Sequence, residues 1–439
     1  MLDIKFIREQ KEFIKEVLRK RKTKFDLDAF LAQDDKRLEI LKNVEHLRSE
    51  QNQVSNRIAS NHTKDAERAQ LISEMRGLKE ELKKSEDDLN EIMKEWQKDM
   101  LVIPNIPSAD TPEGPDESGN KVLRTWGEKP AFSFVPKDHE EIGKALGIID
   151  TDTAAIVTGS RFSYLKGDLV KMQFGLIQMC FELLTDDEKL TQIAKEANVN
   201  VKIKSFIPII PPVFVRPLIQ VKMARFLTPE EHYVFPEDDQ MLVGSAEHTL
   251  GPIHMDHIFK EEDLPIRYAG YSTAFRREAG AAGKDTAGIL RQHQFDKIEM
   301  ETFSLPEHST EEQNFLVAIQ EHLLRELKLP YEVMIVCTGD MGFPDNRQID
   351  INTWMPGQDR YRETHSADST GGFQARRLNT RVRRSDGKIE PVHMNDATAF
   401  AIGRTLIAII ENYQQEDGSV RVPDVLVPYV GKEVIKHRS

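Results

Sequence analysis

Four side chains that could bind a ligand flank one glycine-rich segment, AFRREAGAAGKDTAGILRQHQFDKIEM, residues 274–300. If both ends are strands, Arg276 and Glu278 share one face, and so do Phe295 and Glu299, because alternate residues of a strand point the same way. Burying such groups without partners costs several kcal/mol. A ligand would supply the partners: a phosphate or carboxylate, an amine and a flat ring. A solvent-facing hairpin with ordinary surface charges is the alternative.

The segment between these two ends is longer than most hairpin loops. It holds about a dozen residues rich in glycine, alanine and charge, whereas most hairpin loops have about two to five. We expect a loop that closes over the ligand. The chain contains neither a GxxxxGK(S/T) nor a GxGxxG motif, so a nucleotide must bind by another route.

Two further segments offer groups for anions and metal ions. Arg404 stands in the middle of the apolar, helix-patterned segment 400–414, and a buried arginine needs an anion. A salt bridge to one of the many acidic side chains is the alternative. Glu363 and the hydroxyl residues that follow it, in segment 360–377, offer the oxygen ligands that Mg²⁺ prefers, although a polar loop has the same composition. His365 and His393 have no partner at metal-ligand spacing, so we expect no zinc.

Composition limits the classes of protein and partner. The chain has 439 residues and a net charge of −13, which argues against a broad basic surface for nucleic acid but leaves room for a local one. No apolar run is long enough to span a membrane, and the amino terminus lacks the apolar core of a secretory signal. Cys180 and Cys337 sit in apolar surroundings without metal-ligand spacing. We therefore expect a cytoplasmic protein with reduced thiols.

The first quarter of the chain carries a heptad pattern. Apolar residues recur at alternating spacings of four and three on both sides of a polar break at 61–65. A short break makes neighbouring helices antiparallel, so the pattern predicts a long helical hairpin. A solvated coiled coil that serves only to dimerise is the alternative. The seam positions are Ile40, Val44, Leu47, Gln51, Val54 and Ile58, then Leu71, Met75, Leu78, Leu82, Ser85, Leu89, Ile92 and Trp96.

The rest of the chain mixes strands and helices. Residues 101–120 are rich in proline and predict a linker or surface loop. The proline-broken segment 206–217 suits an edge or interface strand, whereas 331–340 and 348–356 are typical of buried strands. Strands that follow one another, with a few long helices, indicate an antiparallel sheet with helices packed against it, which is an α+β fold.

Several of these segments resemble one family. FRREAGAAGKDTAGILRQHQFDKIE resembles motif 2 of the class II aminoacyl-tRNA synthetases, in the form typical of seryl-tRNA synthetases. AIGRTLIAIIENYQ resembles motif 3, and FIPIIPPVFV, with Pro212, falls where motif 1 lies. GSRFSYLKGDLVKMQ, GDMGF, YRE and FQARR resemble internal signatures of the family, and MLDIKFIRE and IPNIP resemble its amino-terminal part. The resemblance covers essentially the whole chain, in order.

The resemblance implies a domain plan and a reaction. A tRNA-binding helical arm at 1–108 would precede a class II catalytic domain at 109–439, and motif 1 would lie at the interface of a homodimer. The enzyme would activate L-serine with ATP and Mg²⁺ and transfer the seryl group to tRNA(Ser). The selenocysteine tRNA is a further candidate substrate.

The resemblance also implies residue roles. Arg276 would contact the ATP α-phosphate and the serine carboxylate, Phe295 would stack on adenine, and Glu299 would hold the serine amine and hydroxyl. Arg404 would bind the terminal phosphates, and Glu363 and Ser366 would hold Mg²⁺. The other implied ATP contacts are Arg277, Glu278, Gln292, Thr364 and His365. The other implied serine contacts are Ser245, Ala246, Glu247 and Thr398.

The chain departs from the family pattern around the amino-acid pocket. It has Ser245 where the family usually has threonine, Arg277 where motif 2 usually has serine, and Thr-His-Ser after Glu363 in place of Ile-Ser-Ser. Before motif 3 it has Asp-Ala-Thr-Ala-Phe, 396–400, in place of Asn-Gly-Ser-Gly-Leu. Two rival hypotheses are a ligase that loads a small amino acid on a carrier protein and a catalytically silent relative that binds tRNA. The first would lack the arm, and the second would have lost the arginines or Glu363.

Overall fold

The computed structural model describes residues 1–59, 65–225, 229–279 and 288–437. These fall into two compact units, Met1–Pro104 and Asn105–Ser439. The predicted break at 61–65, except Asp65, and most of the predicted closing loop lie outside the described residues. Within the described part of the chain, no helix has the length and apolarity needed to cross a membrane.

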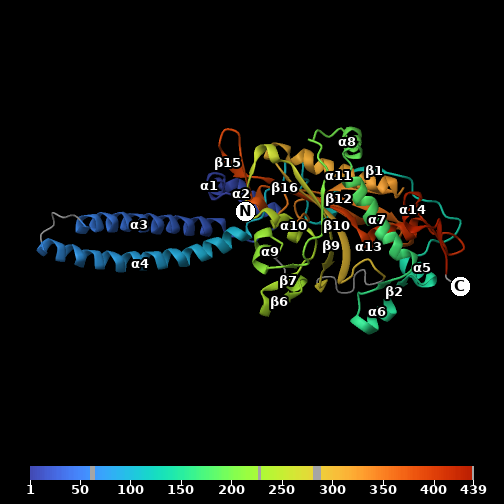
Figure 1. Ribbon diagram of the computed structural model, residues 1–439, viewed down its shortest axis with the longest axis horizontal. Helices are drawn as coiled ribbons and strands as arrows, with labels where there is room; N and C mark the ends of the chain where they lie inside the picture. Colours follow the sequence, from blue (N-terminus) through green and yellow to red (C-terminus); the bar gives the residue numbers. More distant parts are fainter. Residues whose placement is uncertain (60–64, 226–228, 280–287, 438–439) are drawn as a thin grey trace. The chain divides into compact units, whose positions relative to one another are not determined.

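The first unit is built on the predicted helical hairpin. Its helices are α1 (Ile4–Glu9), α2 (Lys11–Lys20), α3 (Leu27–Ala59) and α4 (Asp65–Val102). Figure 1 shows α3 and α4 running side by side. The Asp26 carboxylate accepts the N–H of Ala29 at 2.9 Å and so caps the start of α3. Heptad residues from both helices form the seam, and those buried are Val44, Leu47, Val54, Leu71 and Leu82. The hairpin prediction is confirmed.

The second unit is organised around an eight-stranded sheet in the order β1-β11-β12-β13-β16-β10-β9-β4. Neighbouring strands are antiparallel, except that β4 runs parallel to β9 at one edge. The strands are β1 (Lys121–Trp126), β4 (Ile207–Ile209), β9 (Ile266–Phe275), β10 (Gln294–Ser304), β11 (Tyr331–Ile335), β12 (Arg347–Met355), β13 (Arg360–Gly371) and β16 (His393–Ala401).

Three long helices, α7 (Asp168–Leu184), α11 (Ser309–Glu326) and α13 (Ile402–Asn412), share one apolar core with the sheet. Ile298 and Met300 of β10 point into this core. Because side chains alternate along a strand, Glu299 and Glu301 point to the opposite face of the sheet. The antiparallel sheet with packed helices confirms the predicted α+β fold.

Shorter elements complete the second unit. The helices are α5 (His139–Leu146), α6 (Thr151–Thr158), α8 (Asp187–Glu196), α9 (Pro217–Met223), α10 (Glu247–Leu250), α12 (Phe373–Leu378) and α14 (Val427–Val430). The strands are β2 (Ile149–Asp150), β3 (Tyr164–Leu165), β5 (Phe214–Val215), β6 (Val234–Phe235), β7 (Gln240–Leu242), β8 (Ile258–Lys260), β14 (Arg381–Arg383), β15 (Ile389–Pro391), β17 (Val420–Arg421) and β18 (Val434–Ile435).

Three local expectations are wrong. The polar segment after residue 360 is not a loop but the long strand β13, because pairing with β12 and β16 satisfies its backbone despite its composition. Strand β9 ends at Phe275, and Glu278 has a φ of 51°, so Arg276 and Glu278 are not on a strand. Arg404 lies in the first turn of α13, with a quarter of its side chain exposed, rather than buried in mid-helix.

Candidate active site

One cavity of about 290 Å³ gathers most of the predicted ligand-binding side chains. They come from β10, β13 and β16, from the start of α10 and of α13, and from the segments that follow β9 and precede β10, so only the folded unit brings them together. The predicted residues that line the cavity are Glu247, Arg276, Glu278, Gln292, Phe295, Glu299, Glu363, Thr364, Ser366, Thr398 and Arg404.

Four predicted residues do not line this cavity. Ser245 is buried directly behind it, with its Oγ 3.4 Å from a Glu299 carboxylate oxygen, and its neighbour Ala246 is buried as well. Arg277 is exposed and donates its backbone N–H to the Glu231 carbonyl at 2.9 Å. His365 is buried, with its Nδ1 2.8 Å from the Thr364 hydroxyl, and burial lowers its pKa to about 3.

Arg276 and Phe295 form the mouth of the cavity. The Arg276 N–H donates to the His293 carbonyl at 3.0 Å, which continues the β9–β10 ladder by one residue past the strand end. Its Nε donates to the Gly244 carbonyl at 3.0 Å, and the guanidinium lies 5.3 Å from the centre of the Phe295 ring. The guanidinium is therefore held beside an aromatic face, where both can reach one ligand.

A bulge in β13 places Glu363 and Ser366 on the same side. Ile351 pairs with His365, whereas Asn352 pairs with Glu363, so Thr364 is an extra residue in β13. Residues three apart on a regular strand point to opposite faces, but a bulge reverses this. A second irregularity, between β10 and β16, sets Thr398 opposite Glu299. Both bulges thus turn polar side chains toward the cavity.

Glu363 and Arg404 form an ion pair at the rim. Arg404 lies 3.2 Å from a Glu363 carboxylate oxygen and donates to the Glu363 carbonyl at 2.8 Å. Partial burial opposes ionisation of Glu363, but the guanidinium groups of Arg404 and Arg276 outweigh it and lower its pKa. The ionised carboxylate and the Ser366 hydroxyl are the hard oxygen donors that Mg²⁺ prefers, so the residues present fit that ion.

Glu299 occupies the amino-acid end of the cavity. It is buried and lies 2.5 Å from the Lys297 ammonium, which also donates to the Ser245 hydroxyl at 3.2 Å. Burial raises the pKa of Glu299 to about 7, and the nearby Glu247 carboxylate adds to the shift, while Lys297 opposes it. Glu299 therefore titrates close to neutral pH.

Five charged residues that line the cavity were not predicted: Arg225, Arg291, Lys297, Asp368 and Asp396. Arg225 lies 3.0 Å from Glu247 and 3.4 Å from Asp396, although about 20 and 170 residues separate them along the chain. Nothing in the local sequence pairs groups so far apart. Lys297 could have been predicted, because it shares the strand face of Phe295 and Glu299.

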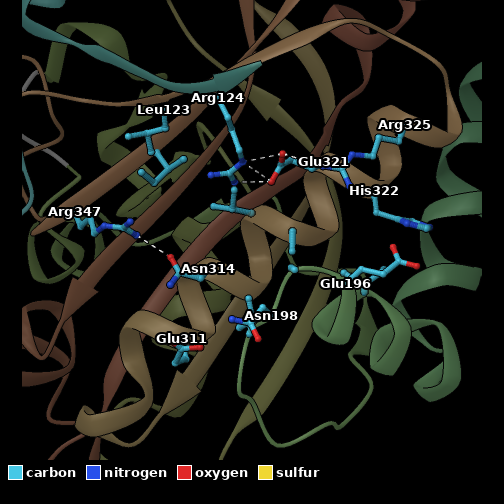
Figure 2. A pocket seen from close by; sticks show the side chains of 16 residues that line it. Leu123, Arg124, Glu196, Asn198, Glu311, Asn314, Glu321, His322, Arg325 and Arg347 are labelled. Atoms are coloured by element: carbon cyan, nitrogen blue, oxygen red, sulfur yellow. Dashed lines mark hydrogen bonds and ion pairs between the residues drawn. The ribbon is translucent and has the colours of Figure 1, made fainter. Parts of the chain in front are cut away.

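A second cavity, of about 470 Å³, lies between β1, the end of α8 and α11, and it contains none of the predicted ligand residues. Figure 2 shows that charged groups in its wall engage one another. Arg124 lies 2.5 Å from Glu321, and Arg347 donates to the Asn314 side chain at 3.1 Å. Because this second cavity contains none of the predicted ligand residues, whereas the first gathers most of them, the first cavity is the better candidate for chemistry.

Comparison with known proteins places the site in a family. Residues 233–413 match the tRNA synthetase class II core domain (G, H, P, S and T), and residues 1–107 match the seryl-tRNA synthetase N-terminal domain. The core match and the antiparallel sheet define a class II aminoacyl-tRNA synthetase.

Full-length relatives identify the family within this class of synthetases. The serine–tRNA ligase of Thermodesulfovibrio yellowstonii is 42% identical, over 99% of this chain and all of the relative. The seryl-tRNA synthetase of Pyrococcus horikoshii, solved in complex with ATP, is 35% identical with a TM-score of 0.87 over the full length of both chains. The seryl enzyme of Naegleria fowleri, solved with AMP, is 30% identical with a TM-score of 0.83. The chain belongs to the seryl-tRNA synthetase family.

Proposed function

We propose that this protein is a serine–tRNA ligase. It activates L-serine with ATP to form seryl-adenylate and pyrophosphate, then transfers the seryl group to the 3′-terminal adenosine of tRNA(Ser). The observation that carries the proposal is the convergence of Arg276, Glu299, Glu363 and Arg404 on one cavity. A catalytically silent relative should have lost some of these groups.

The activation step brings two anions together. The serine carboxylate attacks the α-phosphorus of ATP, a new C–O–P linkage forms, and the bond to the β-phosphate oxygen breaks as pyrophosphate leaves. Because the carboxylate is already ionised, the step needs positioning and charge neutralisation rather than a general base. Arg276 neutralises the α-phosphate and the attacking carboxylate. Arg404 neutralises the terminal phosphates, and Phe295 stacks on adenine. Glu278 and Gln292, which also line the cavity, complete the nucleotide site.

Mg²⁺ fits beside this nucleotide site. Glu363 and Ser366 would hold it, and the ion would supply further neutralisation of phosphate charge. Arg404 pairs with Glu363 at 3.2 Å, so the group proposed for the terminal phosphates and the group proposed for the cation are neighbours.

The serine pocket is lined by Glu299, Glu247 and Thr398, and Ser245 lies behind it with its hydroxyl 3.4 Å from Glu299. Glu299 accepts the substrate ammonium and hydroxyl. A substrate without the hydroxyl leaves these buried polar groups unpaired, which is costly, so alanine is rejected, whereas threonine is excluded by size.

The amino-terminal unit is the proposed partner of tRNA. Residues 1–108 would contact the tRNA backbone through α3 and α4, and residues 109–439 would perform both chemical steps. Contacts to phosphates release counterions, so charging should weaken as salt rises. We place the reaction in the cytoplasm, where tRNA is charged.

The enzyme is further proposed to be a homodimer that pairs through motif 1. The outer edge of β4 lacks a strand partner in the described part of the chain. Ile207 and Ile210 nearby are 48% and 80% exposed. An open strand edge with exposed apolar side chains favours pairing with a second copy.

Amino-acid-dependent ATP–pyrophosphate exchange tests the proposed function. The full-length protein is assayed with serine, threonine, alanine and glycine, followed by charging of tRNA(Ser) with the amino acid that supports exchange. Serine should support exchange at least about a hundred times better than alanine, in line with loss of a hydroxyl contact. Serine exchange without tRNA charging would instead favour a carrier-protein ligase, and no exchange at all would favour a silent relative.

A further inference from the structure

Six buried carboxyl groups form the wall at the amino-acid end of the cavity. We name this set the acidic floor; its members are Glu247, Glu299, Glu301, Asp345, Asp368 and Asp396. Glu247, Glu299, Asp368 and Asp396 line the cavity itself. The pocket therefore holds more carboxyl groups than binding one amino-acid ammonium requires.

The sheet register places three of these groups in one row. Asp396 of β16 pairs directly with Glu301 of β10 on one side and with Asp368 of β13 on the other. Directly opposed residues of antiparallel strands have side chains on the same face, and like charges there are destabilising. The row is thus an unfavourable arrangement unless a positive group offsets it.

Protein cations offset only part of this charge. Arg225 pairs with Glu247 at 3.0 Å and Asp396 at 3.4 Å, and lies 3.7 Å from Asp345 and 3.9 Å from Asp368. Lys297 pairs with Glu299 at 2.5 Å. Two permanent cations therefore face six carboxyl groups.

Glu301 marks the part of the acidic floor that has too few positively charged partners. The residue is 1% exposed, and neither carboxyl oxygen has a hydrogen-bond partner among the residues that the structure describes. It shares the strand face of Glu299 and therefore points toward the same end of the cavity. Burial, with the carboxylates of Glu247 and Glu299, raises its pKa well above the ordinary range. Buried charge of this kind is normally paired.

We propose that the acidic floor is a subsite for a second ammonium group, so that the enzyme accepts short diamino acids as well as serine. In L-α,β-diaminopropionate an ammonium replaces the serine hydroxyl, and three N–H donors would meet carboxylates of the floor. Activation would follow the serine step, with the same O–P bond formed and pyrophosphate released. The proposal rests on the proposed serine activation.

A divalent metal ion is the competing occupant. Oxygens of Glu247, Glu299 and Asp396 lie within 4.8 Å of one another, which would suit an ion. However, Glu247 is already paired with Arg225 and Glu299 with Lys297, so a doubly charged ion would face two cations at close range. A singly charged ammonium meets less repulsion and can share the carboxylate oxygens through hydrogen bonds.

The test compares two amino acids that differ only in charge. Pyrophosphate exchange is measured for L-α,β-diaminopropionate and for L-α-aminobutyrate, in which a methyl group replaces the side-chain ammonium, with serine as reference. We expect kcat/KM for diaminopropionate to exceed that for aminobutyrate at least a hundredfold. Equal values for the two would overturn the proposal. Absence of exchange with serine would instead overturn the proposed function.

Variants locate the subsite. Asp396→Asn and Glu301→Gln keep shape but each removes one ionisable carboxyl group, and each should lower the ratio of kcat/KM for diaminopropionate to that for serine at least tenfold. Glu237→Gln, at an exposed position, is the matched control and should leave the ratio unchanged. An unchanged ratio in both floor variants would contradict the proposal.

Equilibrium binding without ATP gives a readout independent of catalysis. In calorimetry, diaminopropionate should bind the full-length protein at least tenfold more tightly than aminobutyrate, and Asp396→Asn should remove the difference. Manganese is titrated in parallel. Stoichiometric manganese binding that Asp396→Asn abolishes, with no preference for diaminopropionate, would show that the floor is a metal site and would refute the ammonium subsite.

Discussion

Arg276 acts where a strand has just ended. Its backbone still belongs to the β9–β10 ladder through the bond to His293, while its side chain is free to turn across Phe295. The Arg276 backbone is thus fixed by the sheet, while the other N–H donors of its guanidinium can bind a ligand. This positioning contributes to catalysis only if the guanidinium lies beside the phosphate charge of the substrate.

Replacing Arg276 should therefore abolish activation without unfolding the protein. We expect Arg276→Ala to lower serine-dependent pyrophosphate exchange about a thousandfold, as loss of one preorganised charge contact does. The thermal midpoint and tRNA binding should be nearly unchanged, because the side chain is largely exposed. Arg383→Ala, at another exposed arginine, is the control. Activity within a few-fold of the parent would show that motif 2 is wrongly assigned.

Glu299 should make serine binding depend on pH. Its pKa is raised to about 7, and only the ionised carboxylate attracts the substrate ammonium. Below that pKa, binding must first remove a proton, so KM for serine should rise up to about tenfold per pH unit as the pH falls from 7. Above about pH 8, KM should level off. The measurement is exchange kinetics between pH 6 and 8.5 at saturating ATP, and a constant KM over this range would contradict the assignment.

At the scale of elements, we propose separate roles for the helical hairpin and the sheet. Charges that cross the hairpin, such as Arg48 with Glu86 at 2.7 Å, are exposed and contribute little to stability. The hairpin is held mainly by its narrow apolar seam, which leaves its outer surface available for another molecule.

Deleting residues 40–96 should separate the two reactions. Serine-dependent pyrophosphate exchange should stay within about threefold of the parent, because the cavity residues all belong to the second unit. Charging of tRNA(Ser) should fall at least about a hundredfold, since phosphate contacts supply much of the affinity for nucleic acid. Unchanged charging would refute the role of the hairpin.

A buried ion pair between Arg267 of β9 and Glu312 of α11 links the helix to the sheet. The two groups lie 2.7 Å apart, and Arg267 also donates to the carbonyls of Lys202 and Lys204. Removing one partner of a buried ion pair costs roughly 3 to 5 kcal/mol. Glu312→Gln should lower stability to urea by about 3 kcal/mol, while Glu326→Gln, on the exposed side of α11, should not. Equal midpoints for the two variants would show that the pair is not needed.

At the scale of the whole molecule, the proposed pairing through the open edge of β4 makes a prediction about the oligomeric state. Light scattering on the purified protein should give twice the mass of one 50.3 kDa chain. Ile210→Glu places a charge in the proposed apolar contact and should shift the mass toward the monomer, whereas Glu237→Gln should not. A parent protein that is monomeric at micromolar concentration would rule out pairing through this edge.

The sequence by itself determined the elements whose signals are local. Heptad spacing predicted α3 and α4, apolar runs predicted β11 and β12, and the prolines placed segment 206–217 at a sheet edge. The sequence also selected Arg276, Phe295 and Glu299, whose types and spacing lie within one segment and which the structure places around one cavity.

Only the tertiary structure decided which charges meet. Arg225 joins Glu247, Asp368 and Asp396 through contacts between distant segments, and no local pattern encodes such pairing. The bulge at Thr364 reversed the faces expected for Glu363 and Ser366, and β13 formed in a polar segment because two neighbouring strands supplied its hydrogen bonds. Strand pairing and burial act between elements, so the composition of a single element cannot reveal them.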